Sequence, residues 1–109
     1  MNKYFVYITT NPKKSVLYTG MTNDLESRII EHYRNRGKNK TFAGRYFAYC
    51  LLYYETYGKP DHAIEREKEI KDWNRKKKEE LIKAVNPKWR FLNEDVTLWP
   101  PHDEADYRF

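Results

Sequence analysis

The chain has 109 residues, which is enough for one domain and too few for a second independent core. It is basic, with 21 lysines and arginines against 16 acidic residues, a net charge of +5. This balance favours an anionic partner without choosing among nucleic acid, a membrane surface and an acidic protein. The first residues resemble neither a signal peptide nor a membrane span, so we expect a cytoplasmic protein. The single cysteine, Cys50, cannot form an internal disulfide, and we expect a reduced core residue.

Two apolar runs near the N-terminus predict a β-hairpin. Residues 4–10 and 15–20 are rich in β-branched and aromatic side chains, and a short polar connection containing Asn11-Pro12 separates them. Tyr7 and Tyr18 fall on the two arms, and their eleven-residue interval allows them to share a face. Taken alone, such a pair is more often packing than chemistry.

A helix is expected over about residues 24–36. Asn23 is the expected N-cap, Glu26 would complete a capping box, and Gly37 marks the end. Residues Leu25, Ile29, Ile30 and Tyr33 recur at helical spacing and predict its apolar stripe.

Arg28 and His32 lie four residues apart on the shoulder of that stripe. A guanidinium can hold a phosphate through two parallel hydrogen bonds, and an imidazole can move a proton near neutral pH. An exposed pair on a helix flank is the more common meaning of this spacing when it stands alone.

The second half of the chain predicts one strand and two helices. A polar, basic loop is expected over residues 37–45, a buried strand over 48–56, a helix over 60–73 and another over 75–85. Pro60 or Asp61 would lie in the first turn of one helix, Asn74 would cap the other, and Asn86-Pro87 would end it, while the rest has no periodicity. In the last helix, Lys78 (by its stem), Leu81, Ile82 and Val85 would face inward.

The order ββαβαα predicts an α+β fold, with a three-stranded, mainly antiparallel sheet packed against helices. We expect the domain over residues 1–95 and an acidic C-terminal tail over 96–109. One hypothesis is that Asp103, Glu104 and Asp106 fold back and compete with a polyanion; a disordered or simply packed terminus is the alternative.

One glutamate of the 60–73 helix falls among apolar positions. The expected inward stripe is Ala63, Ile64, Ile70 and Trp73, and Glu67 lies within it, whereas Glu65 and Glu69 fall on the wet face. Moving a carboxylate out of water costs on the order of several kcal/mol of desolvation free energy, unless the carboxylate is paired with a cation or binds a metal. Glu67 is therefore either an ion-pair partner of an arginine or a metal or catalytic ligand.

Basic side chains gather in two runs. The first holds Arg34, Arg36, Lys38, Lys40 and Arg45 without a carboxylate, and the second is Arg75-Lys76-Lys77-Lys78. Such runs are often only solvated faces, but two of them beside a separately acidic tail favour a groove for a polyanion.

Taken in order, these residues resemble the GIY-YIG nuclease superfamily, particularly its small stand-alone bacterial members and the N-terminal nuclease domain of the excinuclease. The two family motifs appear as Phe5-Val6-Tyr7 and Tyr18-Thr19-Gly20, Arg28 and His32 match the helical pair, and Glu67 matches the later glutamate. Asn86 corresponds to a late asparagine, and the likeness covers about residues 3–92. Two residues depart from the family motifs: Phe5 replaces the first glycine, and Thr19 replaces the central isoleucine. We interpret both replacements as structural rather than disabling, because the motif tyrosines are retained.

The resemblance implies that Glu67 holds one divalent ion, Mg²⁺ or Mn²⁺, which acts as a Lewis acid. It implies that Tyr7 or Tyr18, assisted by His32, activates or positions water, and that Arg28 stabilises phosphoryl charge. Gly20 and Asn86 would be supporting residues. Phosphates would be contacted by Arg34, Arg36, Lys38, Lys40, Arg45, Arg75, Lys76 and Lys77.

We therefore expect a metal-dependent endonuclease that acts on DNA, including branched or nicked repair intermediates, without a membrane or a small-molecule cofactor. The alternative is a module that binds nucleic acid without cutting it, in which Tyr4, Phe42 and Tyr46 could stack on bases. A third is a protein-interaction domain with a tyrosine-rich surface. The residues leave oligomeric state and the choice of DNA over RNA open.

Overall fold

The computed structural model describes residues 2–102, in which three strands form one antiparallel sheet. The strands are β1 (Tyr4–Thr10), β2 (Leu17–Thr22) and β3 (Cys50–Tyr57), and their order is β2-β1-β3. β1 pairs with both neighbours, so β2 and β3 are the edges. The acidic residues of the predicted tail, Asp103, Glu104 and Asp106, lie outside the described residues.

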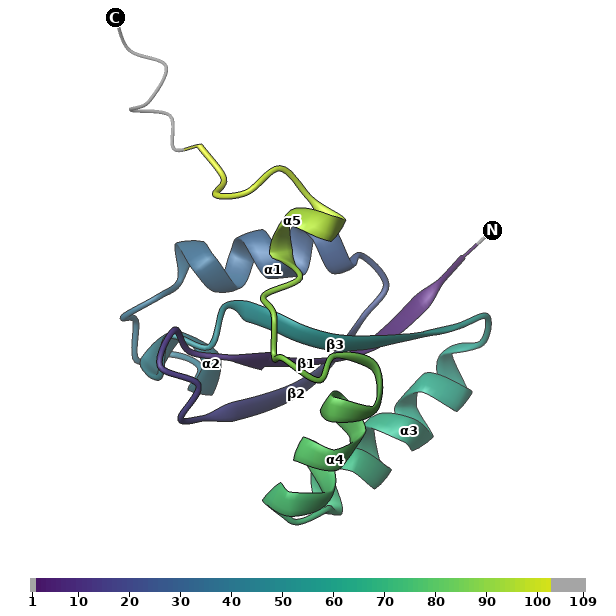
Figure 1. Ribbon diagram of the computed structural model, residues 1–109. Helices are drawn as coiled ribbons and strands as arrows, with labels where there is room; N and C mark the ends of the chain where they lie inside the picture. The colour runs from purple at the N-terminus through teal and green to yellow at the C-terminus, as the bar shows by residue number, and fades with distance from the viewer. Residues whose placement is uncertain (1, 103–109) are drawn as a thin grey trace, which may run out of the picture.

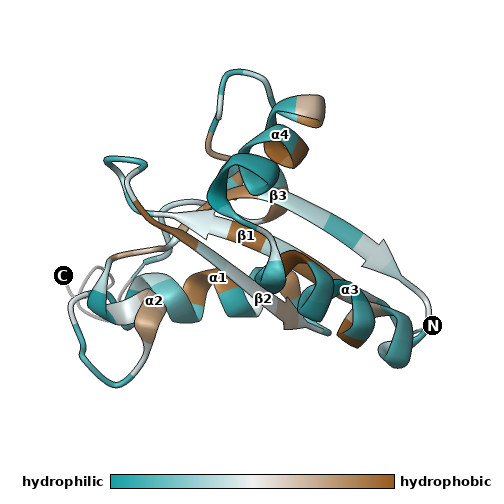
Figure 2. Ribbon diagram, turned by 90° about the horizontal axis from the view of Figure 1, so that it is seen from below, coloured by the Kyte–Doolittle hydropathy of each residue, from teal (hydrophilic) through white to brown (hydrophobic). Residues whose placement is uncertain are grey.

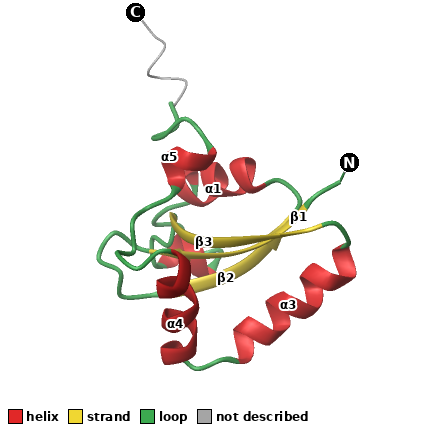
Figure 3. Cartoon of the chain, turned by 45° about the vertical axis from the view of Figure 1, so that its right-hand side comes forward, coloured by secondary structure: helices red, strands yellow, loops and turns green. Residues whose placement is uncertain are grey.

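Helices cover both faces of the sheet, with α1 and α5 on one side and α3 and α4 on the other (Figures 1 and 3). Their bounds are α1 (Leu25–Arg34), α2 (Phe42–Arg45), α3 (Pro60–Asp72), α4 (Arg75–Val85) and α5 (Asn93–Val96). The predicted α+β class and antiparallel sheet are confirmed, and two short helices are added to the predicted order. No helix in the described part of the chain is long and apolar enough to cross a membrane.

The alternation of side chains along β1 divides the core in two. Val6 and Ile8 pack with Ala63 and Ile70 on the side of α3, whereas Tyr7 packs with Leu25 and Ile29 of α1 on the other side. Figure 2 shows hydrophobic residues in parts of the sheet and at intervals along the helices, which are otherwise hydrophilic. Tyr7 is consequently the residue of the β1 centre that points toward α1.

The start of α1 differs from the prediction by one residue. Asp24 is the N-cap: its carboxylate accepts hydrogen bonds from the Ser27 backbone N–H and hydroxyl, so the predicted Asn23–Glu26 capping box is wrong. Both Asn23 and Asp24 are favourable caps, and periodicity cannot separate neighbouring positions.

The predicted basic loop contains α2. Thr41 caps this helix by accepting a hydrogen bond from the Gly44 backbone N–H. A Cβ at Gly44 would lie 2.7 Å from the carbonyl oxygens of both Asn35 and Lys38, so only glycine lets α2 pack this tightly against the end of α1. Four residues are too few to show helical periodicity.

The two longer C-terminal helices begin as predicted, with Pro60 in the first turn of α3 and the Asn74 side chain capping α4. Two inward assignments are wrong. Ile64 is 41% exposed and Val85 is 68% exposed, because the buried stripes are narrow and are formed by Ala63 and Ile70 in α3 and Ile82 in α4. Cys50 is buried as predicted, and burial raises the pKa of its thiol to about 11.

Candidate active site

A buried hydrogen bond joins β1 to α1 at the centre of the candidate site. The Tyr7 hydroxyl lies 2.8 Å from His32 Nε2, and the two residues are 1% and 8% exposed. Tyr7 points to this side because of its position in β1, and His32 lies on the inner shoulder of α1, next to the stripe of Leu25 and Ile29. The pair is therefore held by two rigid elements.

Both members of this pair are neutral near pH 7. Burial, with the nearby Arg28 charge, lowers the pKa of His32 to about 4. Burial is also the largest cause that raises the pKa of Tyr7 well above that of an ordinary tyrosine. In the tautomer with the imidazole proton on Nδ1 the Tyr7 hydroxyl donates to Nε2, and in the other tautomer Nε2 donates to the hydroxyl.

Gly20 makes room for the Tyr7 hydroxyl. It pairs directly with Tyr7 in the β1–β2 ladder, and a Cβ at this position would lie 2.4 Å from the Tyr7 oxygen. That distance is impossible for real atoms, so any larger residue would displace the tyrosine. The predicted supporting role of Gly20 has a specific physical basis: it permits the Tyr7–His32 contact.

Tyr18 lies beside the pair on the same face of the hairpin, as the interval predicts. Its ring centroid is 6.3 Å from that of Tyr7 and 5.4 Å from that of His32. Tyr18 is half-buried, and among the described residues its hydroxyl has no hydrogen-bond partner. Of the two tyrosines, Tyr18 is therefore the one with a hydroxyl available to water or substrate.

Arg28, from α1, and Glu67, from α3 on the other side of the sheet, act on Tyr7 with opposite charges. Arg28 lies one turn before His32, its side chain is 39% exposed, and its charge acts to lower the pKa of both Tyr7 and His32. Glu67 comes from α3, which packs on the edge strand β2, and its charge acts to raise the pKa of Tyr7. Tyr7 thus contacts His32 and Tyr18 directly, and the charges of Arg28 and Glu67 act on its hydroxyl.

The Glu67 carboxylate is weakly held. Its side chain is 22% exposed, and its ion-pair partner is Lys71, 3.5 Å away and half-exposed, rather than an arginine. Glu55, which is 16% exposed, contrasts with it: Arg66 donates to both of its oxygens, and Tyr53 and Tyr57 donate as well. Of these two partly buried carboxylates, Glu67 is the one free to bind a cation.

The chemistry of the site fits a magnesium ion with few protein ligands. No group of three or more His, Cys, Asp or Glu side chains gathers into a metal cage within residues 2–102. Mg²⁺ commonly takes one or two carboxylates together with water and substrate phosphate. One partly exposed carboxylate, that of Glu67, matches that pattern and does not match an all-protein calcium or zinc site.

The first basic run surrounds α2 on the surface. Its five predicted phosphate-binding residues are all exposed: Arg34, Arg36, Lys38, Lys40 and Arg45. In the second run Lys76 and Lys77 are exposed, but Arg75 is engaged within the protein, since it donates to the Lys14 and Ser15 carbonyls and pairs with Glu79. Arg34, Arg36 and Arg45 also donate to backbone carbonyls, but within residues 2–102 no residue of the first run pairs with a carboxylate, so the first run is the better candidate surface for a polyanion.

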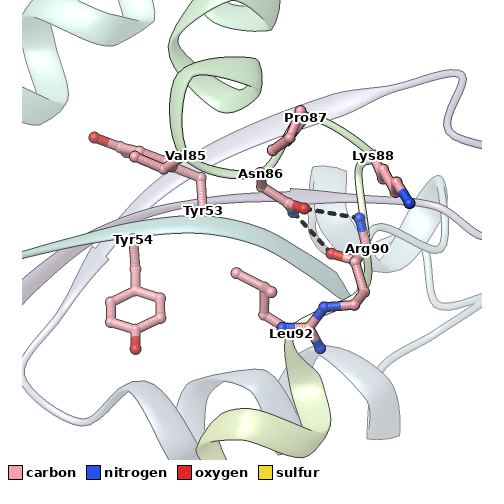
Figure 4. Close-up of a pocket in the computed structure, with 8 residues that line it drawn as sticks. All are labelled: Tyr53, Tyr54, Val85, Asn86, Pro87, Lys88, Arg90 and Leu92. Carbon is pink, nitrogen blue, oxygen red and sulfur yellow. Dashed lines mark hydrogen bonds between the residues drawn. The ribbon is translucent and has the colours of Figure 1, made fainter.

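Asn86 supports the chain after α4. Its side-chain amide donates to the carbonyls of Leu52 and Arg90 and accepts from the Arg90 backbone N–H. Figure 4 shows Asn86 in the wall of a cavity of about 410 Å³, with its amide bonded to the Arg90 backbone. None of the five site residues lines this cavity, and the hydrogen bonds of Asn86 hold the turn after α4.

One neighbour of the site could not be assigned to it from the sequence. The ring of Phe42, in α2, stacks on Tyr18 with a centroid distance of 6.1 Å and an angle of 22° between planes. The sequence shows Phe42 in a basic, aromatic stretch, but the contact joins residues far apart in the chain and depends on a helix too short to predict.

Comparisons with known proteins identify the family to which the chain is similar. Residues 3–80 match the GIY-YIG catalytic domain family. The chain is 39% identical over 82 residues to a UPF0213 protein of Staphylococcus saprophyticus, which covers 75% of this chain and 96% of that protein. It is 40% identical over 83 residues to a UPF0213 protein of Staphylococcus aureus, which covers 76% of this chain and 98% of the relative.

A similar solved structure is the solution NMR structure of the UPF0213 protein BH0048 from Bacillus halodurans. It is 24% identical to this chain, with a TM-score of 0.49, and the match covers 89% of this chain and 97% of that one.

Proposed function

The chain belongs to the GIY-YIG family, and we propose that it is a divalent-metal-dependent endonuclease that hydrolyses phosphodiester bonds in DNA. The observation that carries the proposal is the Tyr7–His32 hydrogen bond, with Tyr18, Arg28 and Glu67 around it. A purely structural hydrogen bond would not need a second tyrosine in ring contact with it, or the opposite charges of Arg28 and Glu67 acting on Tyr7.

The residues have separate roles in this proposal. The accessible hydroxyl of Tyr18 positions the attacking water, because it is the tyrosine that reaches solvent. The buried Tyr7–His32 pair holds the Tyr18 ring in place through the contacts of all three rings. The neutral imidazole is also a proton acceptor within this network. Arg28 binds the phosphoryl oxygens and stabilises their charge in the transition state.

Glu67 would hold the metal ion, since its carboxylate is displaced from Lys71 at little cost. Half-exposed ion pairs contribute little, about 0–1 kcal/mol, so exchange of Lys71 for a divalent cation is feasible. When bound, the ion would supply Lewis-acid stabilisation of the leaving oxygen.

The proposal is tested by incubating the protein with end-labelled single-stranded, branched, nicked and blunt duplex DNA in Mg²⁺ or Mn²⁺. We expect cleavage of at least one structure that disappears when EDTA is added. Phosphate contacts from the exposed basic residues of the 34–45 segment would make DNA binding weaken steeply as the salt concentration rises, and would not depend on the base sequence. Salt-sensitive binding without cleavage of any substrate in either metal would show a binding module instead, and the proposal would be wrong.

A further inference from the structure

An exposed aromatic surface continues directly from the candidate site. Phe42 stacks on Tyr18, and the Tyr46 ring lies 4.7 Å from Phe42 between centroids. Phe42 is 48% exposed and Tyr46 is 43% exposed, so both aromatic side chains leave apolar area in contact with water. A row of rings therefore runs from buried His32 through Tyr18 to solvent.

The position of this surface is well defined by the backbone. Thr41 caps α2, and Gly44 allows the helix to lie against the carbonyls at the end of α1. The next residue after the helix cap, Phe47, has a φ of 58°, a strained value for a bulky side chain, and is also 46% exposed. Strained backbone with exposed aromatic rings is a cost to stability, and such costs concentrate at functional sites.

Charge identifies what would cover these rings. Arg36, Lys38 and Lys40 lie exposed before α2, Arg45 is its last residue, and residues 34–45 contain no carboxylate. Cations beside exposed aromatic rings match the two halves of a nucleotide, since phosphate binds the cations and a base stacks on a ring. None of these four cations forms an ion pair within residues 2–102, and an apolar protein partner would not require them.

We propose that Phe42 and Tyr46 form a base-stacking surface that takes an unpaired nucleotide next to the scissile phosphate. The substrate class is then nucleic acid with a single-stranded stretch, flap or gap at the cut, because bases inside a continuous duplex have no free face to stack on these rings. This inference rests on the proposed function for the position of the phosphate, but the stacking itself is independent of cleavage.

The test measures binding in EDTA, so that no DNA is cut. A short labelled single strand and a blunt duplex of the same length are titrated with the wild-type chain and with Phe42→Leu, and Tyr46→Leu serves as a second variant at the outer ring. Leucine keeps the apolar contact with Tyr18 but removes the aromatic face. Phe91→Leu is the matched control, since Phe91 is 36% exposed and has the Lys14 ammonium 5.3 Å from its ring centroid, yet it lies outside α2.

Phe42→Leu is expected to weaken single-strand binding by about 5- to 100-fold, the range that loss of one base–aromatic stack produces. Tyr46→Leu is expected to weaken it less, and neither variant should change duplex binding. A fluorescent adenine analogue in the single strand should be quenched by the wild type and less by Phe42→Leu. Phe91→Leu should match the wild type in every measurement.

Three results would overturn the inference: unchanged single-strand binding in both variants, equal loss on single strand and duplex, or a change only in self-association by sedimentation. The last would identify a protein-contact surface. If the wild type binds single strands through Phe42 but cuts nothing in Mg²⁺ or Mn²⁺, the proposed nuclease function fails while the stacking surface stands. If the wild type cuts DNA but Phe42→Leu binds single strands normally, the proposed nuclease function stands and the stacking surface fails.

Discussion

The Tyr7 hydroxyl and His32 Nε2 lie 2.8 Å apart, and both residues are almost completely buried. This hydrogen bond joins the central strand to α1, and the partly buried Tyr18 ring contacts the rings of both partners. Burial keeps both partners neutral near pH 7. The pair is therefore suited to hold the site in place, while Tyr18, Arg28 and Glu67 meet solvent.

Tyr7→Phe should lower both stability and activity. The substitution keeps the ring but leaves His32 Nε2 without a partner, which costs about 1–3 kcal/mol for a buried polar group. Urea unfolding should show this loss, and cleavage should slow because the His32 ring, which contacts Tyr18, loses the hydrogen bond that holds it. Tyr57→Phe is the control: it also removes a hydroxyl that donates to a neighbour, Glu55, but lies outside the five-residue site, so it should cleave normally.

Tyr18→Phe should lower the cleavage activity without lowering the stability of the fold. The hydroxyl has no hydrogen-bond partner among the described residues, so its removal should leave the unfolding free energy unchanged. Cleavage should fall by about a hundredfold or more, the range typical of a lost proton-transfer or water-positioning group. Single-turnover cleavage with saturating enzyme separates this effect from binding. Normal cleavage by Tyr18→Phe would assign the role to Tyr7 instead.

Gly20→Ala should disrupt the site without unfolding the sheet. The added methyl would lie 2.4 Å from the Tyr7 oxygen, so the tyrosine must move away from His32. We expect slower cleavage and a changed His32 imidazole signal in the NMR spectrum. Gly58→Ala is the control, because nothing lies within 4 Å of a Cβ at Gly58. An unchanged imidazole signal in Gly20→Ala would contradict the packing argument.

His32 should make the protein sensitive to mild acid. Its pKa is about 4 when folded and 6.5 in an ordinary environment, so between these values the unfolded chain binds the extra proton. The contribution of neutral, buried His32 to the free energy of unfolding is therefore fully present above pH 6.5. It is lost as the pH falls toward 4, and the total loss is up to about 3 kcal/mol.

Urea unfolding at a series of pH values measures this dependence. The wild type should lose more stability than His32→Gln as the pH falls from 6.5 to 4, whereas His62→Gln, which changes an exposed histidine of α3, should follow the wild type. Identical pH profiles for all three proteins would show that His32 is not buried in its neutral form.

Much of the fold could be predicted from local patterns. The hairpin follows from two β-rich runs with a polar connection, and α3 and α4 follow from Pro60, Asn74 and the helical spacing after them. The N-cap of α1 was misassigned because Asn23 and Asp24 are equally good candidates. The short helix α2 could not be found, since it contains only four residues.

The candidate site was predictable in part for the same reason. Local spacing relates Arg28 to His32, and the i, i+4 spacing of Glu67 and Lys71 was also a usable signal for their ion pair. In contrast, the clash that Gly20 avoids and the stacking of Phe42 on Tyr18 are long-range contacts. They depend on how α2 and the hairpin pack in three dimensions, which no local pattern encodes.

The most direct test of the account compares Glu67→Gln with Glu65→Gln in single-turnover DNA cleavage with Mg²⁺. Both changes remove one carboxylate charge from α3, but Glu65 is exposed on the outer face. Glu67→Gln should fold normally and bind DNA in EDTA, yet cleave about a thousandfold more slowly or worse, since a catalytic metal contributes several kcal/mol. Glu65→Gln should cleave like the wild type. Undiminished cleavage by Glu67→Gln would contradict the account.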